Sequence, residues 1–208
     1  MTDEKSDLIG LSQSEIYDSL TANDLIDAKD KFRAKQIWHW LYNKGETDFE
    51  KMSSISKELR SKLSKFYQIK RPTIQTHEKS VDGTQKWLFK LNDGNLIETV
   101  FIPEDNRGTL CVSSQVGCTL NCTFCYTGTQ RLVRNLTSAE IVSQLLVAKD
   151  ELSDWSHKHG RKISNVVFMG MGEPLYNYKN VKQAAKIMGD KEGIQLSTKR
   201  ITLSTSGI

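Results

Sequence analysis

Hydrophobic residues recur at spacings of three and four between residues 12 and 68, which is the period of an amphipathic α-helix. Ser or Asp stands near the start of each periodic stretch, as expected of helix N-caps. In the second stretch Ile37, Trp40 and Leu41 share one stripe, and Gly45 follows as a predicted C-cap. These stretches predict a helical domain over residues 1–70 and read SQSEIYDSL, DKFRAKQIWHWLYNKG and SSISKELRSKLSKF.

The pattern then changes to alternation, which predicts an antiparallel β meander over residues 71–105. Each of its two clearest segments carries apolar residues on one face: Trp87, Phe89 and Leu91 in TQKWLFKL, and Leu96, Val100 and Ile102 in NLIETVFIP. Glu98 breaks the alternation because it falls on the second of these faces. A carboxylate there is either a rim residue paired with a basic neighbour or a catalytic base with a tuned pKa.

From residue 106 to 208, apolar β-runs alternate with amphipathic helices, which predicts a parallel sheet with right-handed crossovers. The expected elements are strands 109–114, 163–169 and 199–205 and helices 137–152 and 178–189. Thr137 or Ser138 caps the first helix, with Glu140 completing a capping box. The last strand has no helix to cover it, so we expect an α/β fold that is the N-terminal part of a larger barrel.

Composition is that of an ordinary globular protein, with 38% hydrophobic and 26% charged residues. The N-terminus lacks the features of a signal peptide, and no apolar run is long enough to span a membrane, so a cytoplasmic protein is expected. Residues 27–72 carry twelve basic and six acidic side chains, a net charge of +6. This segment is either a face for a polyanion or a solvated lysine-rich surface.

Within the basic segment, Lys31, Arg33 and Lys35 are candidates for neutralising nucleic acid phosphates. Trp38 and His39 could stack on bases, although core packing is the simpler expectation for the tryptophans.

Three of the four cysteines, Cys118, Cys122 and Cys125, form a C-x3-C-x2-C pattern in the loop after the first parallel strand. In barrels of this kind the loops after the strands carry the site. A zinc site needs four ligands, and the remaining thiol, Cys111, lies in a strand at an unusual spacing. Three thiolates suit a [4Fe–4S] cluster with one iron left open.

The cysteine pattern, with Phe124 just before its last member, resembles the radical S-adenosylmethionine superfamily. GMGEP at 170–174 is similar to the superfamily's Gly-Glu-Pro motif, one strand further along the chain. The resemblance implies that the open iron chelates S-adenosylmethionine and reduces it to a 5′-deoxyadenosyl radical. It also implies that Gly172 and Glu173 hold the methionine ammonium group.

A closer resemblance covers nearly the whole chain from residue 8. Four segments carry it most clearly: CVSSQVGCTLNCTFCYTGTQ, RNLTSAEIVSQ, VVFMGMGEPL and ITLSTSG. They resemble the RlmN family, which methylates C-2 of an adenine in 23S ribosomal RNA and transfer RNA. The Cfr-type enzymes, which act on C-8 of the same adenine, are similar to a lesser extent.

The family resemblance implies roles for residues outside the cluster motif. Cys111 matches the resolving cysteine, Glu98 the proton acceptor and Ser204 a further S-adenosylmethionine contact. The partners it implies are RNA, docked on the helical domain, and a reductant such as flavodoxin or ferredoxin, with the enzyme acting as a monomer. The family's methyl-carrying cysteine lies far toward the C-terminus, and no cysteine follows Cys125 here, so an incomplete, inactive chain is expected.

Some features keep more than one interpretation. Arg131 and Arg134 could contact RNA phosphates or form salt bridges within the domain. His157 and His159 have a metal-like spacing, but a polar loop favours surface residues. The alternatives to a radical methyltransferase are a zinc-stabilised RNA-binding module that uses all four cysteines and a poorly folding, non-catalytic remnant.

Overall fold

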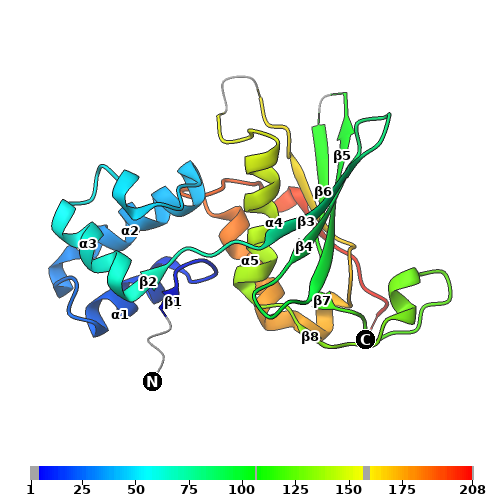
Figure 1. The fold of residues 1–208 in the computed structure, drawn as a ribbon, viewed down its shortest axis with the longest axis horizontal. Coiled ribbons are helices and arrows are strands. Elements are labelled where there is room, and N and C mark those ends of the chain that lie inside the picture. Colours follow the sequence, from blue (N-terminus) through cyan, green and yellow to red (C-terminus); the bar gives the residue numbers. More distant parts are fainter. Residues whose placement is uncertain (1–4, 106, 157–159, 208) are drawn as a thin grey trace.

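A helical domain, a pair of long helices and a twisted sheet follow one another across the molecule (Figure 1). The computed structural model describes residues 5–105, 107–156 and 160–207. The helical domain contains α1 (Gln13–Ala22), α2 (Phe32–His39) and α3 (Lys57–Phe66), and β1 (Ser6–Asp7) pairs in parallel with β2 (Tyr67–Gln68). A π-helical turn over Trp40–Lys44 continues α2, and Gly45 ends it with a φ of +70°, as the predicted C-cap.

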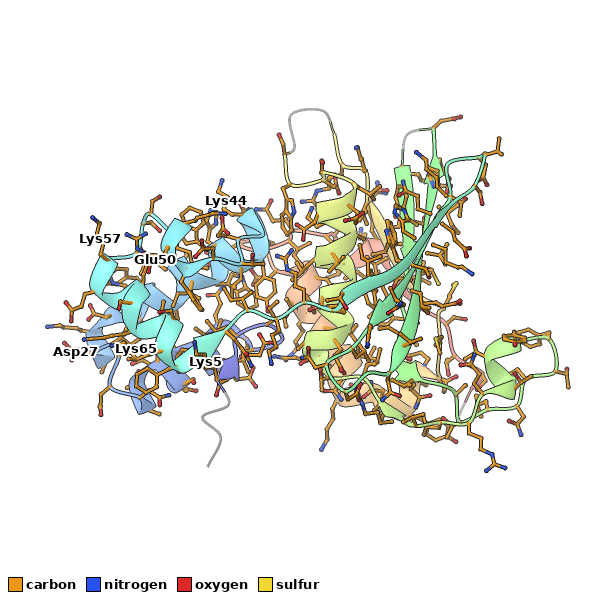
Figure 2. All side chains as sticks on the ribbon, in the orientation of Figure 1. Lys5, Asp27, Lys44, Glu50, Lys57 and Lys65 are labelled. Carbon is orange, nitrogen blue, oxygen red and sulfur yellow. The ribbon has the colours of Figure 1, made fainter. Side chains whose placement is uncertain are left out.

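The apolar stripes of these helices meet in a common core, which confirms the helical pattern. Trp38 belongs to this core and not to a base-stacking surface. Tyr42 is also fully buried, its hydroxyl oxygen accepts a hydrogen bond from the Gly10 N–H at 2.8 Å, and burial raises its pKa. Lys44, Lys57 and Lys65 lie at the rim of the domain with Asp27 and Glu50 among them, so this surface carries both signs of charge (Figure 2).

The sheet has six strands in the order β10-β9-β6-β5-β4-β3. Its strands are β3 (Thr73–Lys79), β4 (Gln85–Lys90), β5 (Leu96–Glu104), β6 (Arg107–Cys111), β9 (Asn165–Phe168) and β10 (Ile201–Leu203). Pairing is antiparallel from β3 to β6 and parallel from β6 through β9 to β10. The predicted meander and the predicted parallel unit therefore share one sheet, joined at β6.

Two helices connect the parallel strands as expected. α4 (Ser138–Glu151) begins at Thr137, whose hydroxyl accepts the Glu140 N–H while the Glu140 carboxylate accepts the Thr137 N–H, the predicted capping box. α5 (Tyr178–Gly189) has the predicted bounds. β6, β9 and β10 are all shorter than predicted. β6 stops at Cys111 because Ser113 and Ser114 leave the ladder to bond with α4 and the loop after β9.

The apolar face that the sequence pattern identifies on β5 is not the covered one. The face of β5 that carries Leu96, Val100 and Ile102 is the open face of the sheet, whereas Ile97 and Phe101 are buried beneath the helices. Thr99 identifies the covered side, because its hydroxyl donates to the Gln144 Oε1 atom of α4 at 2.8 Å. Both faces of β5 carry apolar residues, so alternation alone could not choose between them.

The helical domain packs against the ends of α4 and α5. The Trp38 indole N–H donates to Asp190 Oδ1 at 3.0 Å, and Lys35 pairs with Glu192, so Lys35 takes part in this domain contact. On the other side Arg71 joins the Gly45 carbonyl to Asp150 on α4. Every helix in the described residues is too short or too polar to cross a lipid bilayer.

Candidate functional site

The cysteine-rich loop, residues 117–133, projects from the edge of the sheet (Figure 1). Its stem is an antiparallel pair of two-residue strands, β7 (Gln115–Val116) and β8 (Arg134–Asn135). Gly117 closes the stem with a φ of +76°, and a Cβ atom there would lie 2.2 Å from the Arg131 carbonyl oxygen. The loop begins where β6 has ended, on the side to which the parallel strands direct their C-termini.

The three loop cysteines face a shared cavity of about 360 Å³. Its walls also include Gly172 and Glu173 from the loop after β9, and Ser204 after β10. Loops from three successive parallel strands thus meet at one edge of the sheet, the usual place for a site in such folds. Phe124, which lies at this cavity, is 91% exposed.

Glu173 is the buried carboxylate of this cavity. Its side chain accepts hydrogen bonds from the Leu175 N–H at 3.0 Å and from the Ser206 N–H at 2.9 Å. Burial alone would raise the pKa of Glu173, but these hydrogen bonds, with those from the Thr205 and Ser206 side chains, outweigh it and lower the pKa. Glu173 is therefore a charged acceptor at neutral pH.

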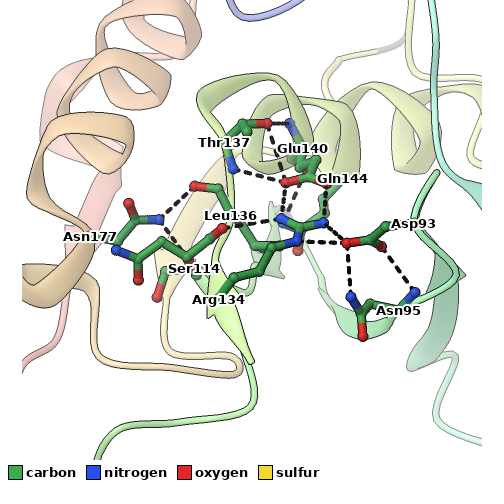
Figure 3. Close-up of polar contacts among 10 residues, drawn as sticks. Asp93, Asn95, Ser114, Arg134, Leu136, Thr137, Glu140, Gln144 and Asn177 are labelled. Atoms are coloured by element: carbon green, nitrogen blue, oxygen red, sulfur yellow. Dashed lines mark hydrogen bonds and ion pairs between the residues drawn. The ribbon is translucent and has the colours of Figure 1, made fainter. Parts of the chain in front are cut away.

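A group of buried polar side chains behind the cavity was not predicted from the sequence. Gln144 bonds to both the N–H and the carbonyl of Ser113, at 2.8 and 2.9 Å. Asn177 donates to the carbonyls of Ser114 and Leu136, each at 2.7 Å (Figure 3). The only sequence signal was a run of polar residues, SSQ at 113–115, directly after an apolar strand.

Arg134 forms salt bridges within the domain, one of its two predicted alternatives. Its guanidinium pairs with Glu140 at 2.7 Å and with Asp93 at 2.6 Å, and Figure 3 shows it between the two carboxylates. Hydrogen bonds to Glu140 and then to Asp93 raise the pKa of Arg134 despite partial desolvation. Arg131 is exposed, and no ion pair is formed by it within the described residues.

Glu98 and Cys111 lie apart from the cysteine cavity, on the open face of the sheet. Cys111 is opposite Val100 in the β5–β6 register, so Glu98 is its diagonal neighbour on the same face. The Glu98 carboxylate lies 3.5 Å from the Lys86 amine. Burial raises the pKa of the Cys111 thiol, with a smaller opposing effect from the Met169 N–H.

In the described part of the chain, no three Cys, His, Asp or Glu side chains are arranged to hold a metal ion. The three loop cysteines line one cavity, but their sulfurs do not converge. His157 and His159 lie outside the described residues. Cys111 does not line the cavity, so the four cysteines are not gathered as one zinc site.

Comparison with known proteins agrees with this geometry. Residues 6–69 match the model of the ribosomal RNA large subunit methyltransferase N-terminal domain, and residues 112–208 match that of the radical SAM superfamily. A crystal structure of a radical SAM methyltransferase from Sphaerobacter thermophilus superposes with a TM-score of 0.86 at 37% identity, over 98% of this chain and 57% of that one.

Curated relatives named dual-specificity RNA methyltransferase RlmN are about half identical to this chain. The relative from Rhodopseudomonas palustris strain BisA53 is 53% identical over 98% of this chain and 54% of its own length. That from Parvibaculum lavamentivorans is 55% identical over 97% of this chain and 53% of its own length. The chain spans about half the length of these relatives. Two matching domain models in order and relatives this similar along nearly the whole chain show that it belongs to the RlmN family of radical SAM proteins.

Proposed function

We propose that this chain supplies the cofactor-binding half of an enzyme that methylates C-2 of an adenine in 23S ribosomal RNA and transfer RNA. The observation that carries this proposal is the single cavity in which Cys118, Cys122 and Cys125 meet Gly172, Glu173 and Ser204. The two sequence motifs and the residue that follows β10 thus line one cavity, whose volume is that of a small-ligand site.

The cavity fits a [4Fe–4S] cluster by its donor chemistry. It offers three thiols and no fourth, which matches a cluster with one iron left open. Cys118, Cys122 and Cys125 would hold the cluster, although in the structure their side chains are not arranged as metal ligands. A bound cluster would supply the electron that cleaves S-adenosylmethionine to a 5′-deoxyadenosyl radical.

The loop after β9 suits the amino-acid end of S-adenosylmethionine. Glu173 is charged, buried and already oriented by backbone N–H groups, so its carboxylate is an acceptor for an ammonium group. Gly172, with a φ of +95°, adopts a backbone conformation that favours glycine and lets Gln115 pack against the turn beside Glu173. Ser204, exposed at the cavity wall, adds a hydroxyl.

The open face of the sheet suits the RNA side of the reaction. Glu98 as proton acceptor and Cys111 as resolving cysteine would act on the same face, one diagonal step apart. The raised pKa of Cys111 keeps it a thiol until a base removes its proton. Glu98 is the carboxylate nearest to it in the strand register.

Anaerobic reconstitution with iron and sulfide tests the proposal. Electron paramagnetic resonance of the reduced chain should give a four-iron signal that changes when S-adenosylmethionine is added. Cys122→Ala should abolish the signal, whereas Cys111→Ala should leave it intact. Stoichiometric zinc in place of iron would favour the metal-stabilised RNA-binding module and contradict the radical mechanism.

The helical domain is the proposed RNA-docking unit. Lys31 and Arg33 flank the exposed ring of Phe32, and neither forms an ion pair with an acidic side chain in the described residues, unlike Lys35. Lys31→Glu with Arg33→Glu should weaken binding of a 23S ribosomal RNA hairpin and reduce its dependence on salt. Lys57→Glu with Lys65→Glu, on α3 of the same domain, is the control for net charge. Equal weakening by both pairs would contradict a specific docking face.

The proposed setting is the cytoplasm, where thiols stay reduced and clusters are assembled. A low-potential one-electron donor such as flavodoxin or ferredoxin would reduce the cluster, and the enzyme would act as a monomer. Light scattering of the reconstituted chain tests the last point.

A further inference from the structure

Gln115 joins the two halves of the cofactor cavity. It is fully buried at the start of the cluster-loop stem. Its Oε1 atom accepts the Glu173 N–H at 2.9 Å and the Thr119 hydroxyl at 3.2 Å. Its Nε2 atom donates to Asn135 Oδ1 at 2.7 Å. One side chain thus contacts the cluster loop, the turn that carries the buried carboxylate, and the returning strand β8.

The backbone of Gln115 supports the same connection. Its N–H donates to the Met171 carbonyl at 3.1 Å. A Cβ atom on Gly172 would lie 2.4 Å from the Gln115 Cβ atom, so the turn approaches the stem as closely as glycine permits. Cys118, the first cluster cysteine, is only three residues from Gln115. The contacts of Gln115 therefore help to set the distance between Cys118 and Glu173.

A carboxamide is required because the position needs an acceptor on one side and a donor on the other. Glu would lose the donor toward Asn135, and an apolar residue would leave both the Glu173 N–H and the Asn135 oxygen without a partner. Three amide side chains are buried in the described residues. Gln144 bonds to Ser113 and to Thr99 of β5, and Asn177 bonds to the carbonyls of Ser114 and Leu136. Gln115 is the one that bonds to both the cluster loop and Glu173.

We propose that Gln115 is a positioning residue that sets the spacing between the cluster loop and the Gly172–Glu173 turn, so that one S-adenosylmethionine reaches the open iron and Glu173 together. This inference rests on the proposed function, because the spacing matters only if both groups hold the same ligand. Gln115 does not line the cavity and would act through Thr119 and Glu173.

The first test measures S-adenosylmethionine binding by the reduced, reconstituted chain. Gln115→Met preserves the buried volume and removes the hydrogen bonds. It should keep the iron content and the four-iron signal but raise the S-adenosylmethionine concentration at half-maximal signal change by about tenfold, as expected for one lost hydrogen bond. Thr119→Val, a smaller change at the loop side, should raise it by roughly threefold and decides the matter if Gln115→Met does not fold.

The matched control is Gln144→Met, which removes an equally buried amide on α4 that bonds to Ser113. It should lower the melting temperature and leave the half-maximal concentration unchanged. An unchanged value in Gln115→Met, or an equal rise in Gln115→Met and Gln144→Met, would overturn the proposal.

A second measurement needs no cofactor. Gln115→Met should accelerate amide hydrogen exchange both at Glu173 and in residues 117–125, whereas Gln144→Met should accelerate it at Ser113. If exchange rises at Glu173 alone, the loop and the turn are not coupled and the inference fails. If Gln115→Met accelerates exchange at both places but the reconstituted wild-type chain gives no response to S-adenosylmethionine, the coupling stands and the proposed function is contradicted.

Discussion

The two faces of the six-stranded sheet differ in what they bury. The covered face packs Ile97, Thr99 and Phe101 of β5 beneath the helices, and the Thr99 hydroxyl donates to Gln144. The open face exposes Leu96 and Ile102 and carries Glu98 and Cys111. Alternate residues of one strand therefore serve different purposes, because stability depends on the covered face while the proposed RNA chemistry uses the open one.

The largest expected effect comes from the covered face. Ile97 is fully buried and Ile102 is 44% exposed on the same strand. Ile97→Ala should lower the free energy of unfolding by about 2–5 kcal/mol through lost burial and a cavity. Ile102→Ala should lower it by about 0.5 kcal/mol. Urea unfolding measures both, and equal losses would mean that the open face is buried in solution.

Removing a threonine hydroxyl should have a smaller effect on stability, and it should differ between the two faces of the sheet. Thr99→Val removes the hydroxyl that donates to Gln144 and should cost about 1 kcal/mol. Thr202→Val, at an exposed position of β10, is the matched change and should leave the melting temperature unaltered. A comparable loss from both substitutions would show that the Gln144 hydrogen bonds add nothing beyond the β-propensity of the position.

Acid pH should reveal the contribution of Glu173. Since folding lowers its pKa below 4.5, its ionised form stabilises the fold above that pH, and this contribution is lost as the pH falls through the folded-state pKa. Glu173→Gln should therefore be less stable than the wild type at pH 7, with the difference narrowing below pH 4.5. Thermal melting at a series of pH values measures this, and a constant difference would contradict it.

The smallest stability effect is expected at Glu98. Its pairing with Lys86 is half-exposed, so Glu98→Gln should change the free energy of unfolding by less than about 0.5 kcal/mol. The same substitution in a relative of full length should abolish RNA methylation while leaving the cluster signal unchanged. A large loss of stability would indicate that Glu98 has a structural role instead of a chemical one.

Local signals in the sequence predicted much of the fold. The capping box at Thr137, the end of α2 at Gly45 and the bounds of α5 all depend on residues a few positions apart. The arrangement of β6, α4, β9, α5 and β10 follows from alternating strand and helix patterns. The same patterns placed the candidate site residues in the loops after β6 and β9, and in the structure residues of these two loops line one cavity.

Other features depend on contacts between distant residues. β5 is apolar on both faces, so only the position of α4 determines that Ile97 is buried and Ile102 is not. Gln115 and Gln144 carry no hydropathy signal for burial, and their partners are up to 58 residues away. Likewise, the sequence could not choose between RNA contact and a salt bridge for Arg134, because its partner Asp93 is brought beside Glu140 only by the fold.

β6 pairs antiparallel with β5 and parallel with β9, and this difference affects the order in which the chain folds. During synthesis, β6 emerges a few residues after β5, so their hairpin closes a short loop at little entropic cost. β9 follows more than fifty residues later, after the whole cluster loop and α4. We therefore expect the antiparallel strands to form first and to present β6 as a ready template onto which the parallel strands are added.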